Sequence, residues 1–337
     1  MFQDVWLPAI LLLCGLAAPA WGQSTYVSDV PLGIDWIIVP DDNRMSAEKV
    51  SLGKQLFFDE RLSGNQTVSC ATCHDPAKGW ADDCRFTPGA HGKPTTRNVP
   101  SIVNAGLHRT LFWDGRAASL EEQALSPLVN PIEMDIRLDL LEERLRGIDG
   151  YRKQFEAIFP DGVTADNVSR ALAAFQRTIL AGETPYDRFR GGHADALDGE
   201  IGVGSGLFFG KAHCGNCHIA KVYTDHQFHN IGTGLSPSGQ EKGLAARTGQ
   251  DADVGKFRTP LLRDLALTAP YFHDGSKATL EEVVDFYNDG GGKNPNLDSH
   301  IVPLKLTDAE KQALVKFLRE GLRSRDYPTI EKPELPE

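Results

Sequence analysis

The sequence has few basic residues and very little methionine. Its 35 Lys and Arg are outnumbered by 46 Asp and Glu, which gives a formal net charge of −11. A nucleic-acid partner requires a basic surface, so this charge argues against nucleic-acid binding. Three methionines are present, Met1, Met45 and Met134. The second half of the chain therefore contains no methionine that could bind a metal there.

Long hydrophobic runs are missing except at the N-terminus. Residues Leu7 to Ala20 are largely apolar and end in small residues, a pattern typical of a signal-peptidase site. We predict a signal peptide over residues 1–22 and export to the periplasm. An uncleaved anchor is the alternative, because Asp4 stands where positive charge is usual. The run is shorter than the ~20 residues of a spanning helix, so we expect no stable membrane insertion.

Cysteine is scarce, and four of the six cysteines fall in two copies of one motif. Residues 70–74 and 214–218 both read C-x-x-C-H, the attachment signature of c-type haem. Two thiols one helical turn apart can each add to a haem vinyl group, and the adjacent His then faces the iron. These residues are Cys70, Cys73, His74, Cys214, Cys217 and His218.

Chance produces this motif ~0.003 times in a chain of this composition, so two copies predict two covalently bound haems c. A structural zinc site or a pair of disulfides would explain the paired cysteines. Neither alternative explains the His that follows both pairs. Of the two other cysteines, Cys14 lies in the predicted signal peptide, and Cys84 is expected to be a lone thiol without a role.

An internal repeat surrounds the two motifs. Residues 53–58 resemble residues 204–209, and residues 112–122 align without a gap on residues 272–282. Each half thus predicts one haem domain with a long loop. The second block of each half contains a helix that starts at an N-cap Ser or Thr followed by Glu.

The fold class is predicted to be mainly α, with two cytochrome c-like haem domains that arise from the repeat. The chain of 337 residues is long enough for two domains of moderate size. We place an N-terminal domain at residues 23–190 and a C-terminal domain at residues 191–337. The boundary falls in a polar, glycine-containing stretch.

The repeat is asymmetric at one position that matters for iron. Extending the alignment places Pro127 opposite Tyr287. Proline cannot bind iron, whereas a tyrosine phenolate can, so the first haem would keep an open face and the second would be closed. Periodicity alone would instead make Tyr287 a core residue. The other candidate ligands in the second half are His226, His229, His273, His300, Tyr223 and Tyr271.

The whole mature chain resembles the bacterial di-haem cytochrome c peroxidase and MauG family. The resemblance rests on the paired motifs together with Arg97-Asn98-x-Pro100, Phe112-Trp113-Asp114-Gly115-Arg116, Glu122-Gln123, Pro131-x-Glu133-Met134 and Thr268-Ala269-Pro270-Tyr271-Phe272-His273-Asp274-Gly275. The resemblance implies an enzyme, an oxidoreductase of the haem peroxidase type that uses hydrogen peroxide.

The resemblance also implies roles for residues near the first haem, which is the peroxidatic one in the family. Glu133 matches the acid/base that moves a proton between the peroxide oxygens, and Gln123 matches the residue that orients peroxide. Trp113 matches a relay between the haems. A solvated loop carboxylate is the alternative for Glu133, and a core tryptophan is the alternative for Trp113.

Two further positions follow from the resemblance. Asn98, Thr268 and Pro270 match a calcium site between the domains, where an amide oxygen and two backbone carbonyls supply hard oxygen ligands. Tyr287 occupies a position that holds Met in ordinary members and Tyr in MauG-like members. An anionic ligand there implies a low reduction potential for the second haem.

Two departures limit the resemblance. Residues 211–213 lack the tryptophan through which MauG reaches its protein substrate, so that substrate is not carried over. His91 lies near the position where ordinary peroxidases carry a His that closes the resting first haem. We leave open whether His91 binds iron or is an exposed loop residue.

Three functions remain as hypotheses. The first is an exported MauG-like peroxidase that shares oxidising equivalents between its haems and oxidises a protein or small donor. The second is a detoxifying peroxidase supplied with electrons by a small cytochrome or cupredoxin. The third is a two-haem electron carrier without catalysis.

Overall fold

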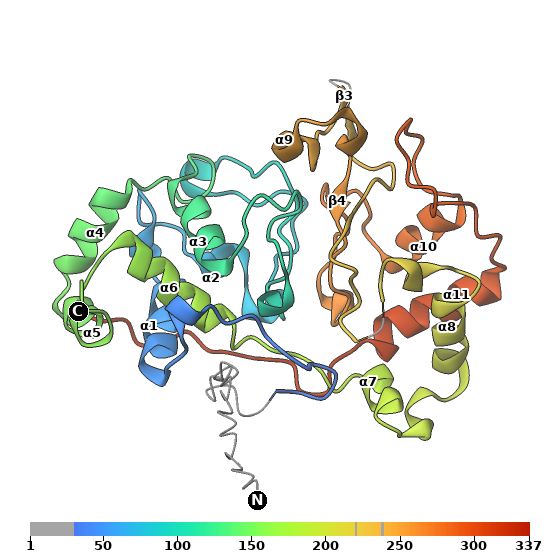
Figure 1. Cartoon of the computed structure of the whole chain (residues 1–337), viewed down its shortest axis with the longest axis horizontal. Coiled ribbons are helices and arrows are strands. Elements are labelled where there is room, and N and C mark those ends of the chain that lie inside the picture. The colour runs from blue at the N-terminus through green and yellow to red at the C-terminus, as the bar shows by residue number, and fades with distance from the viewer. Residues whose placement is uncertain (1–29, 220, 237–238) are drawn as a thin grey trace, which may run out of the picture.

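The computed structural model describes residues 30–219, 221–236 and 239–337, so the predicted signal peptide lies outside the described residues. The chain folds into two mainly helical halves that lie side by side, joined by long loops (Figure 1). None of the helices in this part of the chain combines the length and apolar character that a membrane crossing requires.

Both halves consist of short helices with few strands. The helices of the first half are α1 (Ala47–Phe57), α2 (Cys70–Cys73), α3 (Leu120–Val129), α4 (Leu138–Arg146), α5 (Asp149–Ile158) and α6 (Ala165–Gln176). Those of the second half are α7 (Pro185–Arg190), α8 (Gly199–Phe209), α9 (Ala245–Thr248), α10 (Leu280–Asn288) and α11 (Asp308–Lys316). The strands form two antiparallel pairs, β1 (Phe228–His229) with β4 (Phe257–Arg258) and β2 (Leu235–Ser236) with β3 (Gly239–Gln240).

The structure confirms the two helix N-termini that were predicted within the aligned blocks. Ser119 caps α3 by accepting from the backbone N–H of Glu122, and Thr279 caps α10 by accepting from that of Glu282. A Ser or Thr side chain that satisfies a free N–H in the first turn fixes the helix start. Because both helices begin at aligned residues, positions further along them also correspond.

The repeat extends to a helix crossing in each half. An added Cβ at Gly53 of α1 would lie 1.9 Å from the carbonyl oxygen of Ala171 in α6. An added Cβ at Gly204 of α8 would lie 2.0 Å from the carbonyl oxygen of Ala313 in α11. Glycine is therefore required at both crossings, because only it lets the backbones approach this closely.

The loops of the two halves also share unusual backbone conformations. Asn104 and Asp264 have φ of 59° and 58°, and Phe112 and Phe272 have φ of 64° and 71°. A positive φ is rare for residues other than glycine, and rarer for an aromatic one. Its recurrence at aligned positions confirms that the two halves are copies of one structure.

Each half has its own apolar core, with the aromatic rings of Phe57 and Phe175 in the first and those of Phe208 and Phe317 in the second. Tyr186, on α7, packs in the second core although it precedes the predicted boundary. The boundary itself remains a prediction, and this packing favours one slightly earlier in the chain.

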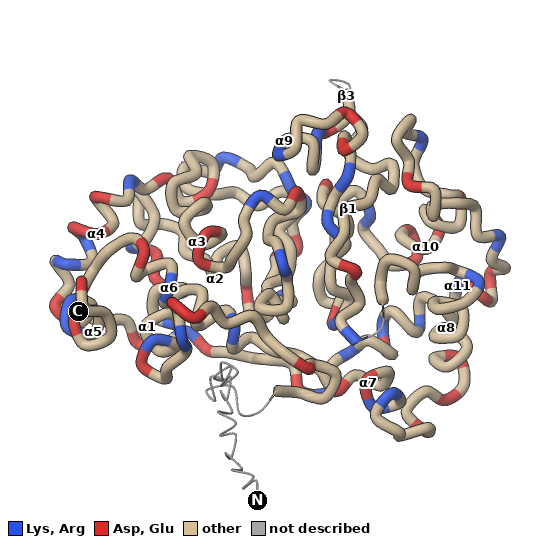
Figure 2. The backbone as a smooth tube through the Cα atoms, viewed as in Figure 1, with Lys and Arg blue, Asp and Glu red and all other residues tan. Residues whose placement is uncertain are grey.

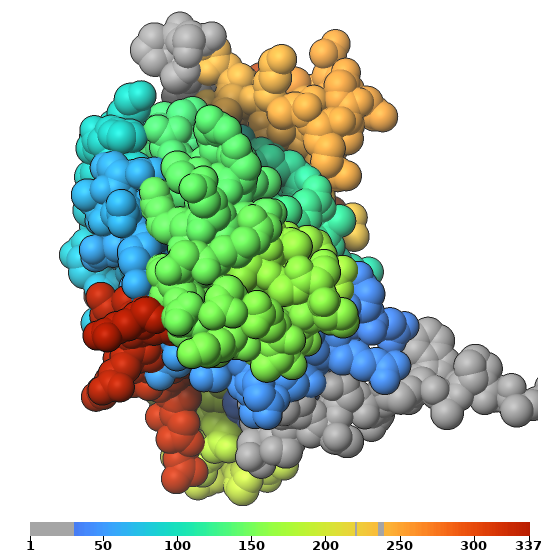
Figure 3. Space-filling view, turned by 90° about the vertical axis from the view of Figure 1, so that its left-hand side faces the viewer, coloured from blue at the N-terminus to red at the C-terminus, as the bar shows by residue number. Residues whose placement is uncertain are grey.

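The C-terminal segment leaves the second half and lies on the first (Figures 1 and 3). The indole N–H of Trp80 donates to the carbonyl oxygen of Pro328 at 2.8 Å, and the backbone N–H of Gly150 donates to that of Glu337 at 3.0 Å. The segment preceding α1 also joins the halves. The backbone N–H of Ile38 donates to the carbonyl oxygen of Gly106 in the first half, and the carbonyl oxygen of Gly33 accepts from the side chain of Arg263 in the second half. The halves are therefore tied together by both ends of the described chain.

Lys and Arg are interspersed with Asp and Glu along the described part of the chain (Figure 2). Most ion pairs are exposed and so contribute little to stability. The pair between Arg263 and Asp187 is an exception, because both side chains are almost completely buried. Breaking such a pair is costly because it leaves a buried charge without a partner.

The glycine crossing gives a matched test of the fold. G204A places a methyl group against α11 and should lower the free energy of unfolding by about 1–3 kcal/mol, the usual cost of overpacking. G206A, on the same helix, meets nothing within 4 Å. It should raise stability by about 0.5–1 kcal/mol, because alanine favours a helix. Thermal and denaturant unfolding would measure the change in stability for both variants. Equal effects of the two substitutions would contradict the requirement for glycine at this helix crossing.

Candidate functional site

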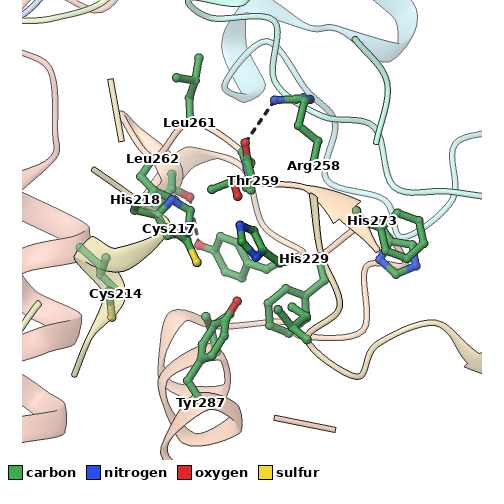
Figure 4. Close-up of a pocket in the computed structure, with 18 of the residues that line it drawn as sticks. Cys214, Cys217, His218, His229, Arg258, Thr259, Leu261, Leu262, His273 and Tyr287 are labelled. Carbon is green, nitrogen blue, oxygen red and sulfur yellow. Dashed lines mark hydrogen bonds between the residues drawn. The ribbon is translucent and has the colours of Figure 1, made fainter. Parts of the chain in front are cut away.

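The second C-x-x-C-H motif lines a cavity of about 260 Å³. Cys214 begins a short 3-10 turn after α8, and Cys217 and His218 follow it directly. Tyr287 of α10 lines the same cavity from below, as Figure 4 shows. The structure therefore brings together the two thiols, the imidazole and the phenol that the sequence assigned to the second haem.

Both motif histidines are oriented by a backbone carbonyl. The Nδ1 atom of His218 lies 2.8 Å from the carbonyl oxygen of Tyr223, and that of His74 lies 3.1 Å from the carbonyl oxygen of Trp80. A carbonyl can only accept, so Nδ1 carries the proton and Nε2 is left as the ligand atom. Burial lowers the pKa of His74 to about 4 and also lowers that of His218, which favours the neutral, metal-binding form.

The cysteines fit haem attachment better than the alternatives. Every cysteine in the described part of the chain is a free thiol, so the paired cysteines form no disulfides there. Burial raises the pKa values of Cys70, Cys73 and Cys214 to about 12, so these thiols are neutral in the protein alone. Among the described residues, the one group placed to hold a metal ion comprises Cys217, Asp225 and His229, which is one cysteine of the second pair without Cys214.

Tyr287 is an apolar-face residue of α10 as well as a candidate ligand. Its ring lies 6.0 Å from that of Phe272 and 5.4 Å from that of Phe286, measured between centroids. Burial, with a smaller contribution from Cys214 and Cys217, raises the pKa of its phenol. The protein alone therefore favours the neutral phenol, so that a nearby cation is needed to stabilise a phenolate.

The corresponding helix of the first half, α3, carries Pro127 at the position of Tyr287. Beyond the helix the chain turns back, and the backbone N–H of Met134 donates to the carbonyl oxygen of Pro127 at 3.1 Å. This turn places Glu133 close to the end of α3. Gln123 precedes Pro127 by one helical turn and so shares its side of the helix.

Glu133 is held in a partly buried position. Its Oε1 atom accepts a hydrogen bond of 2.8 Å from the amide of Asn130. Burial raises the pKa of Glu133, although Arg116 and Asn130 act in the opposite direction. A carboxyl group with a raised pKa is suited to give and take protons near neutral pH.

Trp113 lies between the two halves. Its indole N–H donates to the carbonyl oxygen of Asn98 at 2.9 Å, and its own carbonyl oxygen accepts from the backbone N–H of Arg258 at 2.8 Å. Its ring centroid is 6.4 Å from that of His273. Residues of both halves thus fix the position of this ring.

The sequence did not indicate the charged network beside Trp113. Arg97 donates to Asp114 at 2.7 Å and to Glu241 at 2.6 Å, and His273 lies 2.9 Å from the second oxygen of Glu241. Arg97 and Asp114 belong to the motifs, but Glu241 has no partner nearby in sequence. Only the tertiary fold brings this carboxylate to the boundary between the halves.

The three residues of the predicted calcium site line the same cavity as the second C-x-x-C-H motif. Asn98, Thr268 and Pro270 all line the cavity that also contains Trp113. The amide nitrogen of Asn98 donates to the carbonyl oxygen of Cys84 at 3.1 Å, which leaves its oxygen as the ligand atom. Calcium itself remains a prediction.

His91 lies at the surface. Its Nε2 atom is 3.1 Å from Oδ2 of Asp135, and both side chains are more than two-fifths exposed. The adjacent Ala90 donates its backbone N–H to the carbonyl oxygen of Glu133. Iron ligation by His91 remains a prediction and would require the pair with Asp135 to open.

Four of the other candidate ligands of the second half already have partners for their side chains, and the remaining two, Tyr223 and His226, do not line the cavity. His229 lies 2.8 Å from Asp225 and 2.7 Å from Asp298, and His300 lies 2.9 Å from Asp298. The hydroxyl of Tyr271 donates to the carbonyl oxygen of Leu265. Tyr287 is thus the candidate that combines a position in the cavity with a side chain not committed elsewhere.

The fold and the two motifs define a helical protein with two c-type haem sites. The family described as "Di-haem cytochrome c peroxidase" matches residues 47–195. Methylamine utilization protein MauG of Methylorubrum extorquens is 41% identical over 299 residues, which is 88% of this chain and 84% of that protein. Cytochrome-c peroxidase IdrP1 of Denitromonas iodatirespirans is 37% identical over 360 residues, which is 97% of this chain and 95% of that protein.

Solved structures agree with these relatives. A MauG-like protein associated with microbial copper homeostasis superposes with a TM-score of 0.83 at 37% identity, covering 90% of this chain and 98% of that one. This chain therefore belongs to the di-haem cytochrome c peroxidase and MauG family. It is a haem peroxidase, an oxidoreductase whose family carries two haems c.

Haem attachment can be tested with the remaining thiol as a control. A variant with both Cys70→Ser and Cys73→Ser should carry one covalent haem in place of two, because it lacks the first pair of thioether bonds. Cys84→Ser should keep both, because Cys84 is exposed and outside the motifs. Intact mass and the pyridine haemochrome spectrum count the haems. Loss of a haem from Cys84→Ser would contradict the assignment.

Proposed function

We propose that this chain is an exported, MauG-like peroxidase in which the first haem meets hydrogen peroxide and the second is closed by Tyr287. The observation that carries the proposal is the pairing of Pro127 with Tyr287 on two helices that begin at equivalent caps. Haem iron supplies the redox chemistry when bound, and the protein decides which face of each haem is open.

The residues around α3 are suited to handle the peroxide proton. Glu133 can accept the proton from one oxygen and return it to the other, while Asn130 fixes the carboxylate. Gln123 offers an amide that can both donate to and accept from peroxide. A proton held at Glu133 between these steps is consistent with the raised pKa of this carboxyl.

Trp113 is suited to pass charge between the halves. Its indole N–H is bonded to a backbone carbonyl, which has no tendency to remove the proton. An oxidised Trp113 would therefore keep its proton and return readily to the reduced state. The aromatic contact with His273 and the indole hydrogen bond to Asn98 hold the ring, and the hydrogen bond from Arg258 holds the backbone of Trp113.

The proposal also includes the cellular location of the protein and its redox partner. We infer a periplasmic setting, with oxidising equivalents passed to a protein substrate or drawn from a small cytochrome or cupredoxin. Residues 211–213 hold no tryptophan, so the protein substrate of MauG is not transferred to this chain. A calcium ion at Asn98, Thr268 and Pro270 would complete the boundary between the halves.

A detoxifying peroxidase is the second candidate. Two observations favour it, namely the relatives named cytochrome-c peroxidase and the position of His91 on a loop bonded to Glu133. In this case His91 would close the first haem in the resting state and leave on reduction. The two candidates differ in the coordination of the resting first haem.

The resting ferric protein therefore decides between them. The MauG-like proposal predicts one high-spin and one low-spin haem by EPR, with a long-lived oxidised state after peroxide is added without reductant. Tyr287→Phe should keep both haems attached, lose the low-spin signal of the second haem and abolish that state. Tyr271→Phe is the control, because its hydroxyl bonds to a backbone carbonyl. Two low-spin signals in the resting wild type would contradict the proposal.

The role of Glu133 predicts a dependence on pH. Its carboxyl must be deprotonated to accept the peroxide proton, so the rate of reaction with peroxide should rise with pH through a pKa above that of an ordinary glutamate. Glu133→Gln should lower this rate by about 10²–10⁴-fold and remove the pH dependence. Stopped-flow absorbance would measure it. The control is Glu156→Gln, at an exposed residue of α5 that pairs with Arg152, and it should leave the rate unchanged. An unaltered rate in Glu133→Gln would contradict the acid/base role of Glu133.

A further inference from the structure

Two arginines line the cavity of the second haem, and their charges are balanced differently. Arg263 makes two hydrogen bonds to the carboxylate of Asp187, at 3.0 and 2.7 Å. Arg258 is 4% exposed and makes no ion pair with any carboxylate in the described part of the chain. A buried guanidinium without a counter-charge is expensive, so the structure leaves one charge unmatched in this cavity.

The contacts of Arg258 are all to neutral acceptors. Its Nη1 atom lies 2.7 and 2.9 Å from the two ring nitrogens of His108 and 3.3 Å from the carbonyl oxygen of Thr259, and its Nε atom lies 3.3 Å from the carbonyl oxygen of Phe112. Burial holds the pKa of His108 well below its usual value, so this ring is neutral and accepts. Burial lowers the pKa of Arg258 to about 10, at which it is still charged near neutral pH.

The position of Arg258 in the cavity indicates what balances it. Figure 4 shows Cys214 and Cys217 on one side of the cavity and Arg258 on the other. A haem attached through its vinyl groups carries its two propionates on the opposite edge of the ring. An arginine in that position meets a carboxylate, the anion that its planar donors match best.

We propose that Arg258 binds a propionate carboxylate of the second haem and ties that haem to the loop of the relay tryptophan. The second part of the proposal rests on two bonds within this chain. The backbone N–H of Arg258 donates to the carbonyl oxygen of Trp113, and its side chain donates to that of Phe112. One residue thus contacts the cofactor edge and the neighbouring half.

The other cationic groups near this edge are already neutralised or uncharged. His229 lies between Asp225 and Asp298. His226 lies behind His108, with ring centroids 6.3 Å apart, and burial lowers its pKa. Arg258 is therefore the group whose removal should expose the propionate charge.

The test is the reduction potential of the second haem as a function of pH, measured by spectroelectrochemistry in the intact holoprotein. Arg258→Gln should shift this potential to more negative values, because the ferric state loses a neighbouring positive charge that opposed it. The potential should also gain a pH dependence approaching one proton per electron, since the propionate is then free to titrate. Arg258→Lys should retain most of the wild-type behaviour, and Arg319→Gln, an exposed residue paired with Glu281, should match wild type.

The outcomes separate this proposal from the proposed function on which it rests. A pyridine haemochrome count below two in the wild type would defeat the two-haem assignment itself. With two haems present, an unchanged potential in Arg258→Gln would overturn the role of Arg258 alone. If Arg258→Gln loses the second haem, the result for Arg258→Lys decides. A second haem that is retained in Arg258→Lys with a near wild-type potential supports the proposed role of the positive charge. Loss of the second haem from both variants overturns the proposal and indicates a purely structural role for Arg258.

Discussion

The structure depends on how firmly its two halves are held at Trp113. Three hydrogen bonds to backbone carbonyl oxygens meet there. The indole N–H of Trp113 donates to Asn98, the backbone N–H of Asn98 donates to His273, and the backbone N–H of Arg258 donates to Trp113. Two of the three cross between the halves. Charge transfer between two cofactors requires a fixed distance, and backbone donors and acceptors fix it better than flexible side chains. Both ends of the described chain reinforce this boundary, since each lies across it.

A duplicated scaffold explains how two similar sites acquire different chemistry. The helix crossings at Gly53 and Gly204, the capped helices α3 and α10 and the left-handed loop residues are common to both halves. The scaffold therefore delivers a side chain to the same place over each haem. In one half that side chain is Tyr287 and in the other it is Pro127, so under the proposed function this one position would decide which haem face is closed. The nearby turn then supplies Glu133 only where the face is open.

The parts of the site that were predicted from the sequence are those encoded locally. The C-x-x-C-H turns, the helix caps at Ser119 and Thr279 and the alignment of Pro127 with Tyr287 each need only a few adjacent residues or a simple repeat. The charged contacts between distant residues were not predicted. Glu241 reaches Arg97 and His273 from a loop of the second half. Arg258 lies in the two-residue strand β4, and its backbone N–H bonds to Trp113, which stands 145 positions earlier in the chain.

The charges around the second haem follow from the same arrangement. His218 is neutral because of burial, and its proton is committed to the carbonyl oxygen of Tyr223. A phenolate at Tyr287 would add negative charge to a cavity that already receives the propionates, and the protein on its own disfavours that form. His229 cannot offset this charge, because Asp225 and Asp298 hold it. Arg258 can, because a propionate carboxylate would supply the counter-charge that its buried guanidinium lacks within the protein. On this proposal, the same cation would favour a haem orientation with the propionates toward Trp113, the residue that joins the two halves.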